Sequence, residues 1–175
     1  MFPHFRERPV TKTAERRQRL RDALISAAER TIETDGLSGL KARALANEVG
    51  CAVGAIYNVL ADFDDLIVAV NCRTLAALER DLGASEQISD AAKRAGAVDR
   101  LVRLGTAYLT FAAAHRLRWR ALFEYRLPEG KPIPEQYIED QRRLFRYVEE
   151  PLGELFRPPA HFENRPCRPF FFRMS

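Results

Sequence analysis

The chain has 175 residues, of which 46% are hydrophobic and 30% charged, and its formal net charge is +4. These proportions are typical of a globular protein of one or two domains, and they exclude an intrinsically disordered chain. No apolar run approaches the roughly 18 residues that a membrane-spanning helix needs, and the first residues carry no export signal, so we expect a cytoplasmic protein with no membrane partner.

The N-terminal segment is strongly basic. Residues 1–21 contain seven Lys or Arg side chains and only two Glu. We interpret residues 1–19 as a basic flexible arm. Such an arm is either a solvated leader or, beside an element that enters a DNA groove, an extra contact for a polyanion.

Three helices are predicted next. From Leu20 the apolar residues recur at the spacing of one helical face, and this helix should end at Asp35-Gly36. Residues 40–49 repeat the pattern in shorter form, and Gly50 should end the second helix in the same way. The segment AVGAIYNVL, residues 52–60, follows after a turn and predicts a short third helix. Residues 20–65 therefore form a predicted helix-turn-helix head.

The remaining chain also has helical periodicity. A connector helix capped by Asp62 or Asp64 should reach Gly83, and residues 84–96 indicate a loop or a weak helix start. Further helices are expected over 98–115, through Trp119 to Tyr125, and over 135–155, where Pro151 should kink or end the regular part. No segment alternates with the period of a strand. We therefore predict an all-α fold, with a helical body over residues 66–157 behind the head.

The composition of the third helix suggests a surface that meets DNA. The small residues Ala52, Val53, Gly54 and Ala55 would let the backbone approach base edges and phosphates closely. Ile56, Val59 and Leu60 should point back to the core, leaving Tyr57 and Asn58 outside, where they can donate to a phosphate or pair with adenine. Helical hairpins of this kind also occur in bundles that do not touch DNA.

Residues 21–70 resemble the DNA-binding domain of the TetR family of bacterial transcription regulators. The matching elements are Asp35-Gly36, Ala42-Arg43-Ala44-Leu45-Ala46, Val49-Gly50, Gly54-x-Ile56-Tyr57 and Phe63-x-x-Leu66. The resemblance implies a repressor whose helix-turn-helix, residues 41–60, binds double-stranded operator DNA and is released by a small-molecule effector. The DNA contacts that it implies are Lys41, Ala52, Val53, Gly54, Ala55, Tyr57 and Asn58.

The sequence departs from that family's pattern at several phosphate donors. Leu40-Lys41 stands where the family usually has Thr or Ser, Ala52-Val53 where it commonly has Ser-Lys, and Asp64 where it commonly has Lys. Each lost donor removes a hydrogen bond worth about 1 kcal/mol. We therefore expect DNA affinity to depend on Lys41, Arg43 and the basic arm.

In the body, residues 107–130 resemble TetR-like proteins with a WHG-type C-terminal domain, which implies effector binding and dimerisation over residues 66–157. Aromatic side chains could wall an apolar effector pocket, although aromatics at helical spacing are also common core residues. Similarly, His115, Arg116 and Arg118 either recognise an acidic effector or form a solvated helix end. The candidate ligand-binding residues are Tyr108, Phe111, Trp119, Phe123 and Tyr137.

The C-terminal tail, residues 158–175, contains four prolines and the run Phe170-Phe171-Phe172 without helical periodicity. The resembled family has two further helices here that pair the subunits of a homodimer. Dimerisation of this chain is therefore in doubt, and an altered reading frame near residue 156 is one hypothesis. We expect the body to expose apolar residues such as Leu101 and Leu144.

No motif of an enzyme is present, so we expect neither catalysis nor a cofactor. Cys51, Cys72 and Cys167 are too widely spaced for a zinc site and should be reduced thiols. The alternative to a DNA-binding regulator is a helical effector-binding or protein-interaction module that has lost DNA binding, as the missing donors and the unusual tail would suggest.

Overall fold

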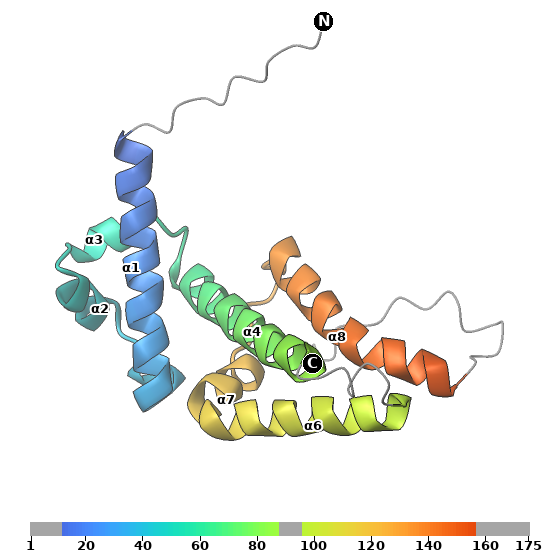
Figure 1. Cartoon of the computed structure of the whole chain (residues 1–175). Helices are drawn as coiled ribbons and strands as arrows, with labels where there is room; N and C mark the ends of the chain where they lie inside the picture. Colours follow the sequence, from blue (N-terminus) through green and yellow to red (C-terminus); the bar gives the residue numbers. More distant parts are fainter. Residues whose placement is uncertain (1–11, 88–95, 157–175) are drawn as a thin grey trace, which may run out of the picture.

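The computed structural model describes residues 12–87 and 96–156, and within these residues it contains helices and no strands, which confirms the all-α fold. Helices α1 to α3 gather at one end of the molecule, and α4 leads from them to the other helices (Figure 1). The elements are α1 (Lys12–Asp35), the 3₁₀ turn η1 (Leu37–Gly39), α2 (Ala42–Val49), α3 (Val53–Ile56), α4 (Phe63–Gln87), α6 (Ala97–Ala114), α7 (Arg116–Glu124) and α8 (Glu135–Leu155).

Helix α1 begins at Lys12, earlier than the apolar pattern predicts. Residues 12–19 are exposed, so they carry no apolar signal, but most are good helix formers. The prediction of a flexible arm is therefore wrong for residues 12–19. Residues 1–11 of the arm, and the tail 158–175, lie outside the described residues.

The head, defined here as α1 to α3, is held together by one apolar core. Leu24 and Ile32 of α1 are fully buried in a cluster with Leu45 of α2, Ile56 of α3 and Leu66 of α4. Each such side chain contributes about 1.5–3 kcal/mol on burial. Ala121 of α7 completes the same cluster. The head core is therefore shared with the body.

Glycines end the first two helices, as predicted. Gly36 has φ 70° after α1, and Gly50 has φ 73° after α2. Gly50 has the left-handed helical conformation, whereas Gly36 combines its positive φ with an extended ψ of −170°. Residues with a Cβ rarely adopt a positive φ, which turns the chain out of a helix.

Helix α4 begins at its predicted cap but ends later than expected. The backbone N–H of Asp65 donates to Asp62 Oδ1 at 2.9 Å. The helix passes through Gly83 and reaches Gln87. A Cβ at Gly83 would lie 3.0 Å from the Tyr147 hydroxyl of α8, so this glycine permits close helix packing rather than ending α4.

The body consists of α4 packed against α6 and α8, with α7 lying between these helices and α1. Leu144 packs in the body core, so its predicted exposure is wrong. The exposed apolar side chains of α6 are instead Val98, Val102 and Leu109, together with Tyr108. Helix α8 continues past the buried Pro151 to Leu155. None of the described helices has the length and apolar character needed to cross a membrane.

Candidate nucleic-acid interface and junction pocket

A tight turn links α2 to α3. After Gly50, the N–H of Cys51 donates to the carbonyl of Ala46 at 2.9 Å. Helix α3 then makes a single helical turn, and the chain continues in turns to Leu60, whose N–H donates to the carbonyl of Ile56 at 2.9 Å. The third helix is therefore shorter than the predicted segment 52–60. Ala52 offers no side-chain cap at its start, and the buried Ile56 and Leu60 fix its far end.

The predicted DNA-contact residues lie mostly at the surface. Tyr57 is 52% exposed, and the side chain of Asn58 is also exposed. Ala55 is the exception, because it is partly buried. The structure brings one group of these residues together on and beside α3, and it places another at the start of α2. The exposed members are Ala52, Val53, Gly54, Tyr57 and Asn58 of the first group and Lys41 and Arg43 of the second.

The basic beginning of α1 lies beside α3. The Arg17 guanidinium donates to the backbone carbonyl of Asn58 at 2.6 Å. Lys12, Arg16 and Arg19 are exposed on the same two turns of α1. Arg17 was not among the predicted contact residues, although the basic run in the sequence pointed to this segment.

A buried arginine connects α7 to the head. Arg118 Nη2 lies 2.8 Å from Glu29 Oε1 of α1, and Nε lies 3.4 Å from Glu33 Oε2. Its guanidinium also donates to the hydroxyl of Thr74 in α4 at 3.2 Å. His115 Nδ1 lies 2.9 Å from Glu33 Oε1. Glu29 and Glu33 of α1 are therefore the acidic partners of His115 and Arg118 in this chain. The interpretation as a solvated helix end is wrong for the buried Arg118, and recognition of an acidic effector stays a prediction.

The five candidate ligand-binding aromatics lie in two groups that share Trp119. Trp119 contacts Tyr108 and Phe123 edge to face, with ring centroids 4.9 and 5.1 Å apart, and Phe111 lies 6.3 Å away. Tyr137 is buried in a cluster against which Trp119 also packs, and burial raises its pKa to about 12. Four of these rings thus pack on one another, but Tyr108 and Phe123 are 37% and 47% exposed and only Phe111 is fully buried. Their role in effector binding stays a prediction.

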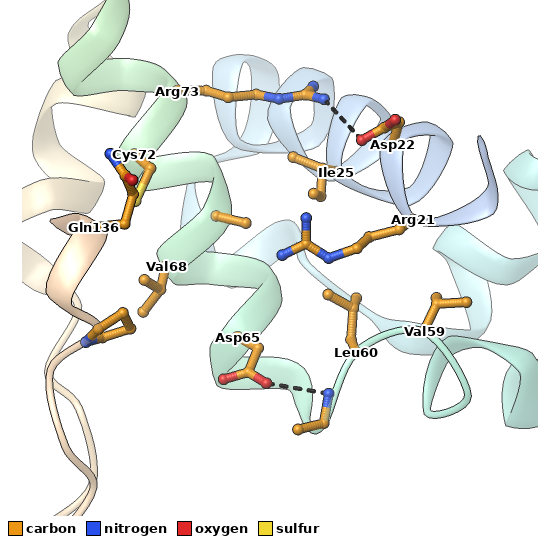
Figure 2. A pocket seen from close by; sticks show the side chains of 13 residues that line it. Arg21, Asp22, Ile25, Val59, Leu60, Asp65, Val68, Cys72, Arg73 and Gln136 are labelled. Atoms are coloured by element: carbon orange, nitrogen blue, oxygen red, sulfur yellow. Dashed lines mark hydrogen bonds and ion pairs between the residues drawn. The ribbon is translucent and has the colours of Figure 1, made fainter. Parts of the chain in front are cut away.

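An open pocket lies elsewhere, where the head meets the body, and none of these aromatics lines it (Figure 2). Its volume is about 500 Å³, and its walls come from α1, the 59–61 turn, α4 and the start of α8. Figure 2 shows the Arg21 side chain reaching between α1 and α4, near Ile25 and Leu60. We name this space the junction pocket. Sequence analysis missed it because its walls are far apart along the chain.

No described group of three or more His, Cys, Asp or Glu side chains is placed to hold a metal ion. The described residues define an all-α protein in which two short helices, joined by a glycine turn, lie against a long first helix and project an exposed surface.

Comparison with known proteins agrees with this fold. No protein-family model and no curated protein matches the chain. Five chains of solved structures match, and one is a protein of unknown function from Rhodococcus sp. RHA1. This chain is similar to that protein at 25% sequence identity and a TM-score of 0.61, over 87% of this chain and 72% of the other.

Proposed function

We propose that the chain is a TetR-like transcription regulator, acting as a cytoplasmic repressor, which binds operator DNA through residues 41–60. The observation that carries this proposal is the open outer face of α3. A Cβ built on Gly54 would meet nothing within 4 Å, and Tyr57 beside it is 52% exposed. Nothing in the described chain covers the surface that a duplex would meet.

The size and chemistry of this surface support DNA as its partner. The major groove is about 12 Å wide and admits one helix. Ala52, Val53 and Gly54 add little bulk between the backbone of α3 and the groove. The hydroxyl of Tyr57 and the amide of Asn58 are free to donate to phosphates or bases.

Exposed basic side chains lie near the starts of α1 and α2, the two helices that precede α3. Lys41 and Arg43 are exposed at the start of α2, and Lys12 and Arg16 are exposed near the start of α1. The contact from Arg17 to Asn58 keeps that end of α1 beside α3. These cations would neutralise phosphates, so the affinity should fall steeply as salt concentration rises.

The rest of the proposal concerns regulation and assembly. We infer that the body binds a small effector that lowers DNA affinity, and that two copies read a palindromic operator. The exposed apolar side chains of α6, Val98, Val102 and Leu109, offer a surface for pairing.

Selection of binding sites from a random duplex pool, followed by fluorescence anisotropy over a series of salt concentrations, tests the function. We expect a retained consensus with two symmetric half-sites. A pool with no retained sequence even at low salt would contradict DNA binding and favour the alternative, a helical effector-binding or interaction module.

Two substitutions test the contact assignment. Tyr57→Phe and Lys41→Ala each remove one phosphate donor, so each should weaken DNA binding about fivefold, the equivalent of roughly 1 kcal/mol. Arg142→Ala is the control, because Arg142 is an exposed cation of α8 in the body. If Tyr57→Phe and Lys41→Ala both bind as tightly as the wild type, the contact assignment is wrong.

A further inference from the structure

The junction pocket has the dimensions of a small-molecule site. Its volume of about 500 Å³ lies within the roughly 300–1,000 Å³ usual for such sites. It is lined by Ile25 of α1, Leu60 of the turn, Val68 of α4 and Gln136 of α8. A bound molecule would therefore touch the head and the body at once.

Most charged groups of the pocket wall already have partners. Arg73 donates to Ser26 at 2.9 Å and to Glu29 at 3.3 Å. Asp65 accepts a hydrogen bond from the N–H of Ala61 at 3.1 Å and lies 3.2 Å from Lys131 Nζ. These two charges are compensated within the chain.

Asp22, the remaining acid of the wall, accepts a hydrogen bond from Gln18 at 3.0 Å and lies 4.0 Å from Arg73. Unlike Arg73, Asp65 and Asp22, Arg21 has no such partner among the described residues. It is partly buried and lines the pocket, yet it makes no hydrogen bond or ion pair with any residue of the described chain. Figure 2 shows its guanidinium inside the space between α1 and the 59–61 turn. Among the described residues, Arg21 is therefore the one cation of the pocket wall without a compensating partner.

Buried apolar side chains line the pocket around this cation. Ile25, Leu60 and Val68 are each less than 10% exposed although they line the pocket. Burial raises the pKa of the nearby Cys72 thiol to about 12, so this side chain is uncharged at neutral pH. A ligand that matches these walls has one anionic group and a hydrocarbon part.

We propose that the junction pocket binds a small monocarboxylate, with Arg21 pairing with the carboxylate and the apolar lining receiving the hydrocarbon part. A guanidinium presents two parallel N–H donors that fit the two oxygens of a carboxylate. The site gives the proposed effector a place and a chemical class, and it rests on the proposed function only for its regulatory meaning. Binding of the carboxylate itself requires no DNA.

The test is isothermal titration calorimetry on the full chain without DNA, so its outcome is independent of whether the protein binds an operator. The probes are octanoate and 3-phenylpropanoate, each compared with its primary amide, which has the same shape but no charge. At least one carboxylate should bind about tenfold more tightly than its amide.

Arg21→Gln should remove this preference, weakening carboxylate binding about tenfold and leaving amide binding unchanged. Arg21→Lys should retain part of it, because Lys keeps the charge but not the two-donor geometry. Arg19→Gln is the matched control, since Arg19 lies on the same helix, is exposed and does not line the pocket. Thermal melting should show that Arg21→Gln is folded.

Three results would overturn the proposal: no binding of either carboxylate, equal affinity for the carboxylates and their amides, or an unchanged carboxylate affinity in Arg21→Gln. The comparison between acid and amide uses the wild-type protein, so it tests the preference for a carboxylate even if a variant fails to fold.

Discussion

Arg118 is a charged side chain in an almost fully buried position, only 7% exposed, and it holds three helices together. Its partners Glu29 and Glu33 are themselves partly buried, and Thr74 supplies a third acceptor. A buried ion pair contributes little net stability compared with apolar packing, but removing one partner leaves the other charges uncompensated. Removal of Arg118 should therefore lower the free energy of unfolding by more than any single one of its contacts contributes.

We expect Arg118→Met to lower the free energy of unfolding by about 3 kcal/mol, because Glu29 and Glu33 would lose their most buried cation and keep only the more exposed Arg73 and His115 as partners. Urea denaturation measures the change. Arg116→Met, an exposed neighbour on α7, should change stability by no more than about 0.5 kcal/mol. Equal effects of the two substitutions would show that the burial of Arg118 has no energetic consequence.

Gly54 provides a test in which the free protein and the proposed complex should respond differently. A new side chain meets open space in the free protein, so Gly54→Val should leave the folded state intact. In the complex, it would hold α3 away from the groove and lower DNA affinity by more than about tenfold, measured by anisotropy. Gly153→Val, also in open space but on α8, is the control. If Gly54→Val binds DNA as tightly as the wild type, α3 is not part of the interface.

At the scale of elements, the start of α4 is fixed from two directions. Asp62 accepts a hydrogen bond from the N–H of Asp65, and the N–H of Ala61 donates in turn to the Asp65 carboxylate. Lys131, in the segment between α7 and α8, lies 2.5 Å from Asp62 Oδ1 and 3.2 Å from Asp65 Oδ1. A connection distant in sequence therefore reinforces the cap that begins the connector helix.

Because of these contacts, the stability of the fold should depend on pH in a direction that can be stated. The hydrogen bond from Lys131 and that from the N–H of Asp65 lower the pKa of Asp62 below its ordinary 3.8. A lowered pKa means that ionised Asp62 stabilises the fold above the unfolded-state pKa, and this contribution is lost as pH falls through the folded-state value.

We therefore expect Lys131→Met to lower the melting temperature near neutral pH, with the difference from wild type shrinking below about pH 4. Since Asp62 is 46% exposed, the effect should stay below about 1 kcal/mol. Thermal melts at a series of pH values provide the measurement. A difference that grows as the pH falls would contradict the assigned role of Asp62.

The sequence predicted those elements that bury one face and end in distinctive residues. Helix α8 has its predicted bounds, and Gly36 and Gly50 end their helices as expected. The predictions from sequence were wrong where something other than a local apolar pattern sets the bounds of a helix. The start of α1 is solvated on all sides, and the glycine at position 83 is required by Tyr147, a residue distant in sequence.

At the scale of the whole molecule, head and body share a core, because Ala121 of α7 is buried among residues of α1 to α4. Such sharing should make unfolding cooperative across the molecule. Trp119, the single tryptophan, reports on the body, whereas far-ultraviolet circular dichroism reports on all the helices.

We expect the Trp119 fluorescence and circular dichroism transitions in urea to have the same midpoint, because α7 cannot leave without opening the head core. The control is Arg118→Met, in which both transitions should move together. A fluorescence transition at lower urea than the loss of ellipticity would instead show that the body unfolds independently.

The two candidate sites differ in how far the sequence could predict them. The surface of α3 is local, so a short run of small residues followed by Tyr57 and Asn58 is readable as a motif. The junction pocket is not local, because Ile25, Val68 and Gln136 come from three helices. In the sequence, Arg21 is one more charge of a basic segment, and only the structure shows that it has no hydrogen-bond or ion-pair partner among the described residues.

Because α7 contributes Ala121 to the core of the head, the head cannot be transferred to another protein by itself. A chimera that moved residues 12–62 onto an unrelated scaffold would leave a void where Ala121 sits and would strand the carboxylates of Glu29 and Glu33. A transplant of the head must therefore carry the complementary face of α7. Point replacements on the outer surface of α3 are free of that constraint, and they offer the simpler route to altering the proposed DNA interface.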